Sequence, residues 1–417
     1  MERYSERMET KLFWQSSMPK HWHMIKLKYV LKKLQRSKMP NAELLICSNS
    51  GRVTKRGDNK LGLVADDDKI YQGVGKGDLL IHGMDTWHGA IAISEYDGMC
   101  TPVVHVCESN QNKSFIAYYL RNMAYEKVFK LISNGVRQNT SDFRCWDKLA
   151  AIPIILPPLT EQQAIVSYLD IKCSKLDTLV ENKEKEISLL SEMKQRIIAD
   201  AVTRGLNPNV KFKATNIPWL PEIPEHWKLL RNKSFMKQTD EKVGKQQNVT
   251  LLSLTKQGVI VRDLSEGKGK FPKDFESYII VKPKNLVFCL FDIDETPRTV
   301  GLVRNNGMLT GAYSNFQIDE EVVEPEFTYY YYLQVDDVKG LKPFYTGLRK
   351  VVKINTFSQL RIPIPPLSEQ QAIVSYITER TAKIDSLIEK LNKEIECIKE
   401  YKQRLISDVV TGQIKVS

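Results

Sequence analysis

Two stretches of the chain carry apolar residues at alternating spacings of four and three, the pattern of a helix that buries one narrow stripe. In the first stretch the stripe consists of Leu176, Val180, Ile187, Leu190 and Ile197, with Lys183 and Lys194 as polar interruptions. In the second stretch it consists of Ile384, Ile388, Leu391, Ile395, Ile398, Leu405 and Val409, with Lys402 as a polar interruption. A helix cannot bury such a stripe alone. The pattern therefore predicts two long helices that pack against each other as a coiled coil.

The starts and ends of both helices are also marked. Thr160 and Gln163, and likewise Ser368 and Gln371, have the spacing of a capping box, in which a hydroxyl and a Gln side chain satisfy the first free amides. A Pro-Pro pair precedes each box, and Gly205 or Gly412 follows about 43 residues later. At the rise of an α-helix, each element reaches ~65 Å.

The chain is an internal repeat, which decides how the fold is read. Residues 157–206 and 365–414 are identical at 26 of 50 positions, without a gap. The repeat continues more weakly upstream, where Pro-x-His-Trp at 19–22 matches 224–227. Each copy of about 200 residues therefore consists of a variable part followed by a nearly fixed part. This contrast is explained if the fixed part must fit one partner or the other copy of itself, while the variable part is free to read different targets. The alternative is that packing constrains the two parts unequally.

The variable parts show mixed short patterns. Residues 44–47, 78–81, 251–254 and 285–290 are predicted to be strands, and residues 114–130 and 326–335 are predicted to be helices. Both predicted helices are rich in tyrosine, at Tyr118, Tyr119 and Tyr329 to Tyr332. We expect these rings to pack in the core rather than to stack on bases. Each variable part is thus expected to be an α/β module.

The charge is concentrated in the variable parts. Lys and Arg number 61 against 50 Asp and Glu, a net charge of +11, of which residues 16–150 hold +7 and residues 217–358 hold +2. This surplus favours a polyanionic partner such as DNA. The candidate DNA contacts are basic or amide residues in turn-like stretches, namely Arg52, Lys55, Arg56, Lys60, Arg137, Gln138, Lys256, Arg262, Lys268, Lys270, Arg349 and Lys350. Arg137 and Arg349 are the strongest, because a Gly-x-Arg sequence precedes the fixed part in both copies.

No feature points to catalysis, a metal or a membrane. The chain has seven Cys without a CxxC pair, and His82, His88, Cys100, His105 and Cys107 match no standard zinc spacing, so we expect them to be core or loop residues. The sequence lacks a phosphate-binding GxxxxGK[ST] motif and an Asn/Asp-Pro-Pro-Tyr/Phe tetrapeptide. The N-terminus lacks the apolar core of a signal peptide, and a cytoplasmic protein is expected. The expected class is a protein that is not an enzyme.

The repeated order of Pro-x-His-Trp, variable part, Gly-x-Arg, Pro-Pro-Leu-Ser/Thr-Glu-Gln-Gln and long helix resembles the specificity subunit of bacterial type I restriction–modification systems. The resemblance implies an α+β fold in which two target recognition domains are joined by two long helices in an antiparallel coiled coil, with a pseudo-two-fold repeat. The expected divisions are residues 1–150, 151–206, 207–358 (a linker to about 218, then the second recognition domain) and 359–417.

The same resemblance implies a function. Each recognition domain is expected to read one half of a split, asymmetric DNA site, while the helices set the spacer and bind two methyltransferase subunits. Motor-nuclease subunits complete the complex, and S-adenosylmethionine, ATP and Mg are expected to be used by these partners and not by this chain. Three alternatives stay open: the recognition subunit of a related type II system, a coiled-coil scaffold that does not bind DNA, and a cryptic enzyme.

Overall fold

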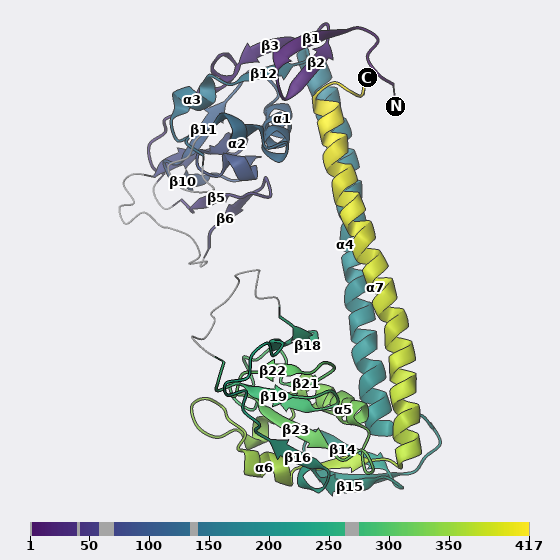
Figure 1. Ribbon diagram of the computed structural model, residues 1–417. Coiled ribbons are helices and arrows are strands. Elements are labelled where there is room, and N and C mark those ends of the chain that lie inside the picture. Colours follow the sequence, from purple (N-terminus) through teal and green to yellow (C-terminus); the bar gives the residue numbers. More distant parts are fainter. Residues whose placement is uncertain (1, 40–41, 58–70, 134–140, 263–274, 417) are drawn as a thin grey trace. The chain divides into compact units, whose positions relative to one another are not determined.

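The computed structural model describes residues 2–39, 42–57, 71–133, 141–262 and 275–416 (Figure 1). Two compact units divide the chain: unit 1 comprises Met1–Lys183 and Asn392–Ser417, and unit 2 comprises Glu184–Leu391. Each unit therefore combines one variable part with helical segments from both copies of the repeat. No helix among the described residues is both long enough and apolar enough to cross a membrane.

Unit 1 is built around a four-stranded antiparallel sheet in the order β4-β11-β8-β9. Its remaining strands form the antiparallel pairs β1–β2, β3–β12, β5–β6 and β7–β10. The strands are β1 (Arg7–Leu12), β2 (Gln15–Pro19), β3 (His23–Lys26), β4 (Lys32–Lys33), β5 (Leu45–Cys47), β6 (Val53–Lys55), β7 (Gln72–Val74), β8 (Leu79–His82), β9 (Ile91–Ile93), β10 (Gly98–Cys100), β11 (Val104–Glu108) and β12 (Pro153–Leu156). The short helices are α1 (Lys113–Tyr125), α2 (Val128–Ile132) and α3 (Trp146–Ala150).

Unit 2 has the same topology. Its four-stranded sheet has the order β16-β23-β20-β21, and its strand pairs are β13–β14, β15–β24, β17–β18 and β19–β22. The strands are β13 (Phe212–Ile217), β14 (Leu220–Pro224), β15 (Lys228–Arg231), β16 (Met236–Thr239), β17 (Leu252–Thr255), β18 (Gly258–Val261), β19 (Ile279–Val281), β20 (Leu286–Phe288), β21 (Val300–Leu302), β22 (Gly307–Leu309), β23 (Ser314–Ile318) and β24 (Arg361–Ile364). The short helices are α5 (Pro325–Asp337) and α6 (Ile354–Gln359).

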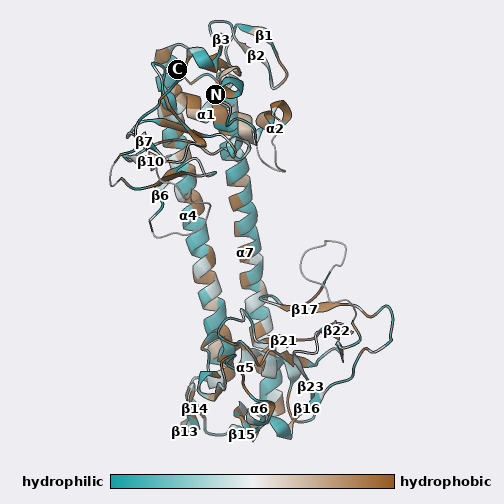
Figure 2. Ribbon diagram, turned by 90° about the vertical axis from the view of Figure 1, so that its left-hand side faces the viewer, coloured by the Kyte–Doolittle hydropathy of each residue, from teal (hydrophilic) through white to brown (hydrophobic). Residues whose placement is uncertain are grey.

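The two long helices are α4 (Leu159–Arg204) and α7 (Leu367–Val410). Both consist largely of hydrophilic residues with apolar residues interspersed (Figure 2), as expected for helices that bury only a stripe. Within unit 1, Lys183 pairs with Glu394 and Asp177 pairs with Lys402, so residue numbers fall along α4 as they rise along α7. The first part of α4 is therefore antiparallel to the last part of α7. In unit 2, Lys194 pairs with Asp385 from the remaining parts of the same helices.

The core of each unit joins its variable part to the long helices. In unit 1 the buried Trp22 and Phe115 belong to one cluster with Leu169 of α4 and Val409 of α7. In unit 2 the buried Trp227 and Phe327 belong to one cluster with Val202 of α4 and Ile373 of α7. A variable part thus packs against the start of one long helix and the end of the other.

Most elements predicted from the sequence are found within a few residues of their expected positions. β5, β8, β17 and β20 occupy the four predicted strand segments, and α5 occupies the predicted helix at 326–335. The predicted helix at 114–130 is divided into α1 and α2, because Lys127 adopts a left-handed conformation with a φ of 60°. The linker predicted over 207–218 is wrong in its second half, since residues 212–217 form β13 and pair with β14.

Candidate nucleic-acid interface

The first group of predicted DNA contacts lies on the β5–β6 hairpin of unit 1. Arg52 is exposed beside Gly51, whose φ of +73° is the left-handed conformation that favours glycine. The guanidinium of Arg121 lies beneath this turn and donates to the Ser50 carbonyl at 2.9 Å. Lys55 is exposed and pairs with Glu43 at 2.6 Å. The hairpin therefore presents its cations from a turn that the rest of the unit supports.

The corresponding hairpin of unit 2, β17–β18, carries the second group. Lys256 is exposed in its turn, and Arg262 follows β18 with a half-buried side chain. The Arg262 amide donates to the Leu251 carbonyl at 2.9 Å, which closes the base of the hairpin. The same element thus carries candidate contacts in both units. Arg56 of unit 1 is half-buried at the equivalent place, where its amide donates to the Leu44 carbonyl.

The Gly-x-Arg sequence of unit 2 lies in a tight turn between Thr346 and Val351, which form an antiparallel bridge. Arg349 donates to Asp292 at 2.6 Å, and the Lys350 ammonium lies 3.0 Å from Asp294. The hydrogen bond from Lys350 holds the pKa of the Asp294 carboxyl below its usual value, so this carboxylate stays charged. The two predicted DNA contacts therefore already have carboxylate partners within their own unit.

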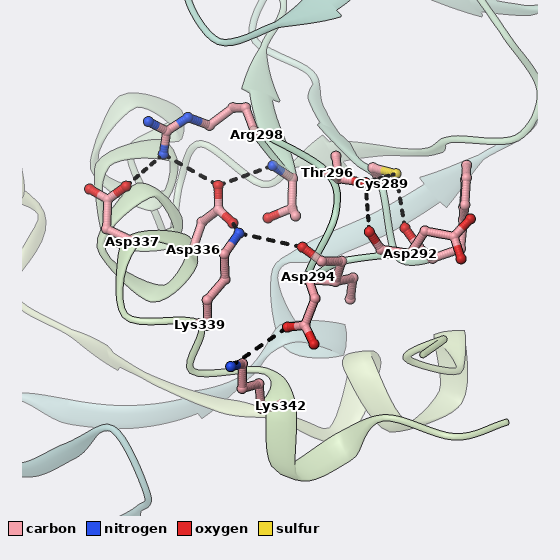
Figure 3. Close-up of polar contacts among 12 residues, drawn as sticks. Cys289, Asp292, Asp294, Thr296, Arg298, Asp336, Asp337, Lys339 and Lys342 are labelled. Carbon is pink, nitrogen blue, oxygen red and sulfur yellow. Dashed lines mark hydrogen bonds and ion pairs between the residues drawn. The ribbon is translucent and has the colours of Figure 1, made fainter. Parts of the chain in front are cut away.

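A denser polar cluster lies beside this turn (Figure 3). The Asp336 carboxylate is almost fully buried, and it accepts hydrogen bonds from the Thr299 amide, Arg298 and Lys339 at 3.0–3.3 Å. Arg298 also donates to Asp337 at 2.9 Å. A buried carboxylate that accepts this many hydrogen bonds has a structural role. It connects the end of α5 to the segment that follows β20.

Five predicted DNA contacts lie outside the described residues: Lys60, Arg137, Gln138, Lys268 and Lys270. The remaining candidates lie in three places: the β5–β6 hairpin of unit 1, the β17–β18 hairpin of unit 2, and the turn at 346–351 of unit 2.

The predicted capping boxes are wrong. The Gln162 amide donates to the Pro158 carbonyl at 3.0 Å, and the Gln370 amide donates to the Pro366 carbonyl at 3.0 Å, so each helix begins before its hydroxyl residue. Thr160 and Ser368 are therefore inside the first turn of α4 and α7, and Gln163 and Gln371 follow them on exposed positions of the helices. The Pro-Pro-Leu sequence enters the helix directly, because proline suits the positions whose amides would be unpaired.

The neighbouring residues of the same motif make the contacts that sequence reasoning missed. Gln162 is buried, its side-chain amide donates to the Pro157 carbonyl at 2.8 Å, and its side-chain oxygen accepts from the Asn112 amide at 3.0 Å. Gln370 does the same in unit 2, with the Pro365 carbonyl at 2.9 Å and the Glu324 amide at 2.8 Å. Each Gln therefore fixes the start of α1 or α5 to the start of a long helix.

The Pro-x-His-Trp motif contacts the Glu-Gln-Gln motif in both units. Trp22 donates its indole N–H to Glu161 at 3.2 Å, and His21 lies 2.9 Å from the same carboxylate. In unit 2, Trp227 donates to Glu369 at 3.2 Å and His226 lies 2.8 Å from it. The sequence could have indicated these contacts, because both motifs are shared by the two copies of the repeat. We refer to these two contacts as the junctions.

The end of a long helix closes each junction. Gly412, just after α7, has a φ of +67°, and a Cβ atom there would lie 2.6 Å from Pro19 and 3.1 Å from Trp22. Gly205, just after α4, has a φ of +75°, and a Cβ atom there would lie 3.2 Å from Trp227. Both glycines are required by backbone conformation and by close approach of the aromatic ring.

The predicted stripe positions are buried or half-buried along both helices. The buried ones include Val180, Ile384, Leu391, Ile395, Leu405 and Val409, and the half-buried ones are Leu176, Ile187, Leu190, Ile197, Ile388 and Ile398. The three lysines that interrupt the stripe each reach an acid on the other helix.

The histidine and cysteine residues considered for a metal have other partners. Cys100 and Cys107 are buried, and burial raises the pKa of each thiol to about 12. His105 is buried and its Nε2 donates to the Phe143 carbonyl at 2.7 Å. No group of three or more His, Cys, Asp or Glu side chains suited to a metal ion occurs among the residues that the structure describes.

The tyrosines were expected to pack. Tyr119, Tyr331 and Tyr332 are buried, and the Tyr332 hydroxyl accepts from the Asn232 side chain at 2.5 Å. The prediction is confirmed for these three rings, while Tyr118, Tyr329 and Tyr330 are half-buried and pack against the edge of the core clusters.

Comparison with known proteins gives the family. Residues 19–189 and 231–397 match the type I restriction modification DNA specificity domain. A putative type I restriction enzyme MjaX specificity subunit from Methanocaldococcus jannaschii is 27% identical over 360 residues, which cover 82% of this chain and 79% of that protein. The MjaVIII specificity subunit of the same organism is 26% identical over 278 residues, which cover 64% of this chain and 63% of the relative.

The fold agrees with a solved structure. A chain from a structure titled as the basis of complex assembly and conformational transition of the type I R-M system aligns with a TM-score of 0.70 and 13% identity. The alignment covers 95% of this chain and 99% of that chain. Since the two matched segments cover most of the sequence, the chain belongs to the family of type I restriction–modification specificity subunits, which are not themselves catalytic.

Proposed function

We propose that this chain is a DNA-recognition subunit in which each variable part reads one half of a split site. The single observation that carries this proposal is the shared topology of the two units, whose hairpins β5–β6 and β17–β18 present basic residues at matching places. Since the two variable parts differ in sequence, the two half-sites are expected to differ, and the complete site is asymmetric.

The long helices are proposed to form an antiparallel coiled coil that sets the spacer between the half-sites. Supporting observations are the ion pairs Asp177–Lys402 and Lys183–Glu394, whose order is antiparallel in unit 1, and the pair Lys194–Asp385, which joins the same helices in unit 2. An antiparallel pair of matched helices has a two-fold axis, and a two-fold reader fits two half-sites at a fixed separation.

The partners are proposed to supply the chemistry. Two methyltransferase subunits would dock on the helices and use S-adenosylmethionine, and motor-nuclease subunits would use ATP and Mg. Large exposed apolar side chains on the helices, among them Leu189 of α4 and Leu387 of α7, support a role in partner docking. We propose a cytoplasmic location for this complex.

The proposal is tested by sequencing the methylated sites in a host that carries this chain with its methyltransferase. The expected result is one split motif with two different half-sites and a fixed spacer. Replacing residues 16–150 by the variable part of another such protein is expected to change one half-site only. A continuous motif, or a change in both halves after the exchange, would contradict the proposal.

A further inference from the structure

Leu348 is the most exposed large apolar side chain among the described residues, with an exposed fraction of 103%. It lies at the tip of the turn between Thr346 and Val351, in the loop that leads into α6 and projects from unit 2 (Figure 1). Single exposed apolar residues are common on protein surfaces. The exposure of Leu348 therefore matters only in combination with the way its turn is held.

The backbone of this turn is fixed at several points. Thr346 and Val351 exchange two hydrogen bonds of 2.9 and 3.0 Å, and the Lys350 amide donates to the Gly347 carbonyl at 3.2 Å. Gly347 and Lys350 have φ values of +70° and +47°, the left-handed conformations that a tight turn requires.

The turn is also attached to the segment after β20. The Asp292 amide donates to the Arg349 carbonyl at 2.9 Å, and the Asp292 carboxylate accepts from the Arg349 side chain at 2.6 Å. The Arg349 guanidinium also lies over the Phe291 ring at 5.3 Å. A side chain carried by such a braced turn loses little backbone freedom on binding, which is the condition for a preorganised contact.

The charge around the tip indicates what it contacts. Residues 338–360 contain Lys339, Lys342, Arg349, Lys350 and Lys353 and no acidic residue. The side chains of Lys342, Lys350 and Arg349 remain 58%, 45% and 69% exposed although each has a carboxylate partner. An apolar tip among accessible cations fits a duplex, in which phosphates flank the bases, better than the apolar pocket of a protein partner.

The repeat supplies a second observation. The sequence Gly135-Val136-Arg137 of the first copy also has an apolar residue between the glycine and the arginine. An apolar residue is therefore retained at the middle position of the Gly-x-Arg sequence although the variable parts have diverged.

We propose that Leu348 is an apolar contact between unit 2 and a base of its half-site, and that Arg349 and Lys350 position the turn and hold phosphate. This inference rests on the proposed function. It assigns a base contact to a residue that no search for charged residues would select, and it gives Arg349 the role of positioning the turn and holding phosphate.

The test uses the complete complex with its methyltransferase subunits and DNA that carries the site found by methylome sequencing. Leu348→Ala is expected to weaken specific binding about tenfold, with an unchanged slope of affinity against salt, because no phosphate contact is lost. Val338→Ala, which shortens another exposed apolar side chain of unit 2, is the matched control and is expected to bind as the wild type does.

Two DNA variants distinguish the kinds of base contact. If Leu348 touches a thymine methyl, replacing that thymine with uracil weakens the wild type to the level of Leu348→Ala and has no effect on the variant. If Leu348 enters a base step, 2-aminopurine at that step becomes fluorescent with the wild type and not with the variant.

Unchanged specific binding by Leu348→Ala would overturn this inference and leave the proposed function intact. Loss of the methyltransferase subunits from the Leu348→Ala complex, seen by size-exclusion chromatography, would assign the tip to a protein interface and would also overturn it. Absence of site-specific binding by the wild-type complex would instead overturn the proposed function.

Discussion

The Nζ atom of Lys402 lies 2.6 Å from one carboxylate oxygen of Asp177 and 2.7 Å from the other. The same pair of residue types recurs 208 residues away in the repeat, where Lys194 lies 2.6 and 2.7 Å from the oxygens of Asp385. Lys183 and Glu394 form a third pair that the repeat does not match, because Leu391 stands where a second lysine would be. Lysines that interrupt the apolar stripe thus serve as polar contacts between the helices.

We expect a double-mutant cycle on Asp177→Ala and Lys402→Ala to give a coupling of about 0.5–1 kcal/mol in the free energy of unfolding. The pair is bidentate but partly exposed, so the coupling is expected to decrease in 1 M NaCl. Urea denaturation measures it. The exposed pair Lys383–Glu379 on α7 is the control, with an expected coupling smaller than that of Asp177–Lys402. Equal couplings for both pairs would show that the helix contact adds nothing.

Removing Glu369 is expected to destabilise unit 2. Glu369→Ala leaves the indole N–H of the fully buried Trp227 without its acceptor, at an expected cost of about 1.5–3 kcal/mol. Glu369→Gln retains an acceptor oxygen and is expected to lose less than half of that. Chemical denaturation followed by tryptophan fluorescence compares the two variants. Equal loss in both would mean that charge, and not the hydrogen bond, is what the junction requires.

Gly412→Ala is expected to destabilise unit 1 by more than its backbone conformation alone explains. The added methyl would meet Pro19 at 2.6 Å, in addition to the strain of a φ of +67°. Gly244→Ala isolates the strain, since Gly244 has a φ of +56° and nothing within 4 Å of a Cβ atom. The control is expected to lose about 1 kcal/mol, and Gly412→Ala at least 1 kcal/mol more. Thermal denaturation that ranks the two equally would remove the steric argument.

His105 is expected to make stability depend on pH. Burial lowers its pKa below the usual value, although the hydrogen bond with the Phe143 carbonyl acts in the opposite direction. Below the unfolded pKa of ~6.5 the unfolded chain binds a proton that the native state does not, so stability falls as pH falls. The slope reaches at most about 1.4 kcal/mol per pH unit for one proton.

The measurement compares urea denaturation of the wild type and His105→Gln between pH 7.5 and 5. The variant is expected to be less stable at pH 7.5 and to have a shallower slope below pH 6.5. Some slope remains, because burial also lowers the pKa of His82. Parallel profiles for the two proteins would exclude His105 as a source of the pH dependence.

Lengthening both long helices is expected to lengthen the spacer of the DNA site. One heptad inserted at facing positions of α4 and α7 keeps the apolar stripe in register and adds about 10 Å, or roughly three base pairs. Methylome sequencing reads the result directly. Seven residues inserted after Asn209, in the exposed segment between Gly205 and β13, form the control and are expected to leave the spacer unchanged. A spacer unaffected by the heptads would refute the helices as a ruler.

The fold was largely predictable from the sequence for two reasons. Hydrophobic periodicity can be read within one segment, and the repeat can be recognised by comparing the two copies directly. The stripe from Leu176 to Ile197 and its twin from Ile384 to Val409 predicted helices that the structure contains, and the four predicted strands are present. The predicted capping boxes were wrong because the spacing of a hydroxyl residue and a Gln does not determine where a helix begins. The Gln162 amide donates to the Pro158 carbonyl, so α4 begins before Thr160.

The candidate site was less predictable, because its partners are distant in sequence. Arg349 is bound by Asp292, 57 positions away, and Trp22 is bound by Glu161, 139 positions away. The lysines in the stripe were visible as interruptions, but their acids depend on which residues face each other on two separate helices. Sequence identity between the two copies was the one signal that pointed to the junctions. It identified the residues involved but not which of them contact each other.

Each compact unit takes the end of a long helix from the other copy of the repeat, with Gly412 beside Trp22 and Gly205 beside Trp227. A polypeptide with a single copy of the repeat would therefore lack the helix end against which its variable part packs. Only a second molecule could supply that helix end. Fusion of two copies in one chain makes this exchange internal. It also allows the two variable parts to diverge, because the two copies of the repeat no longer have to be identical.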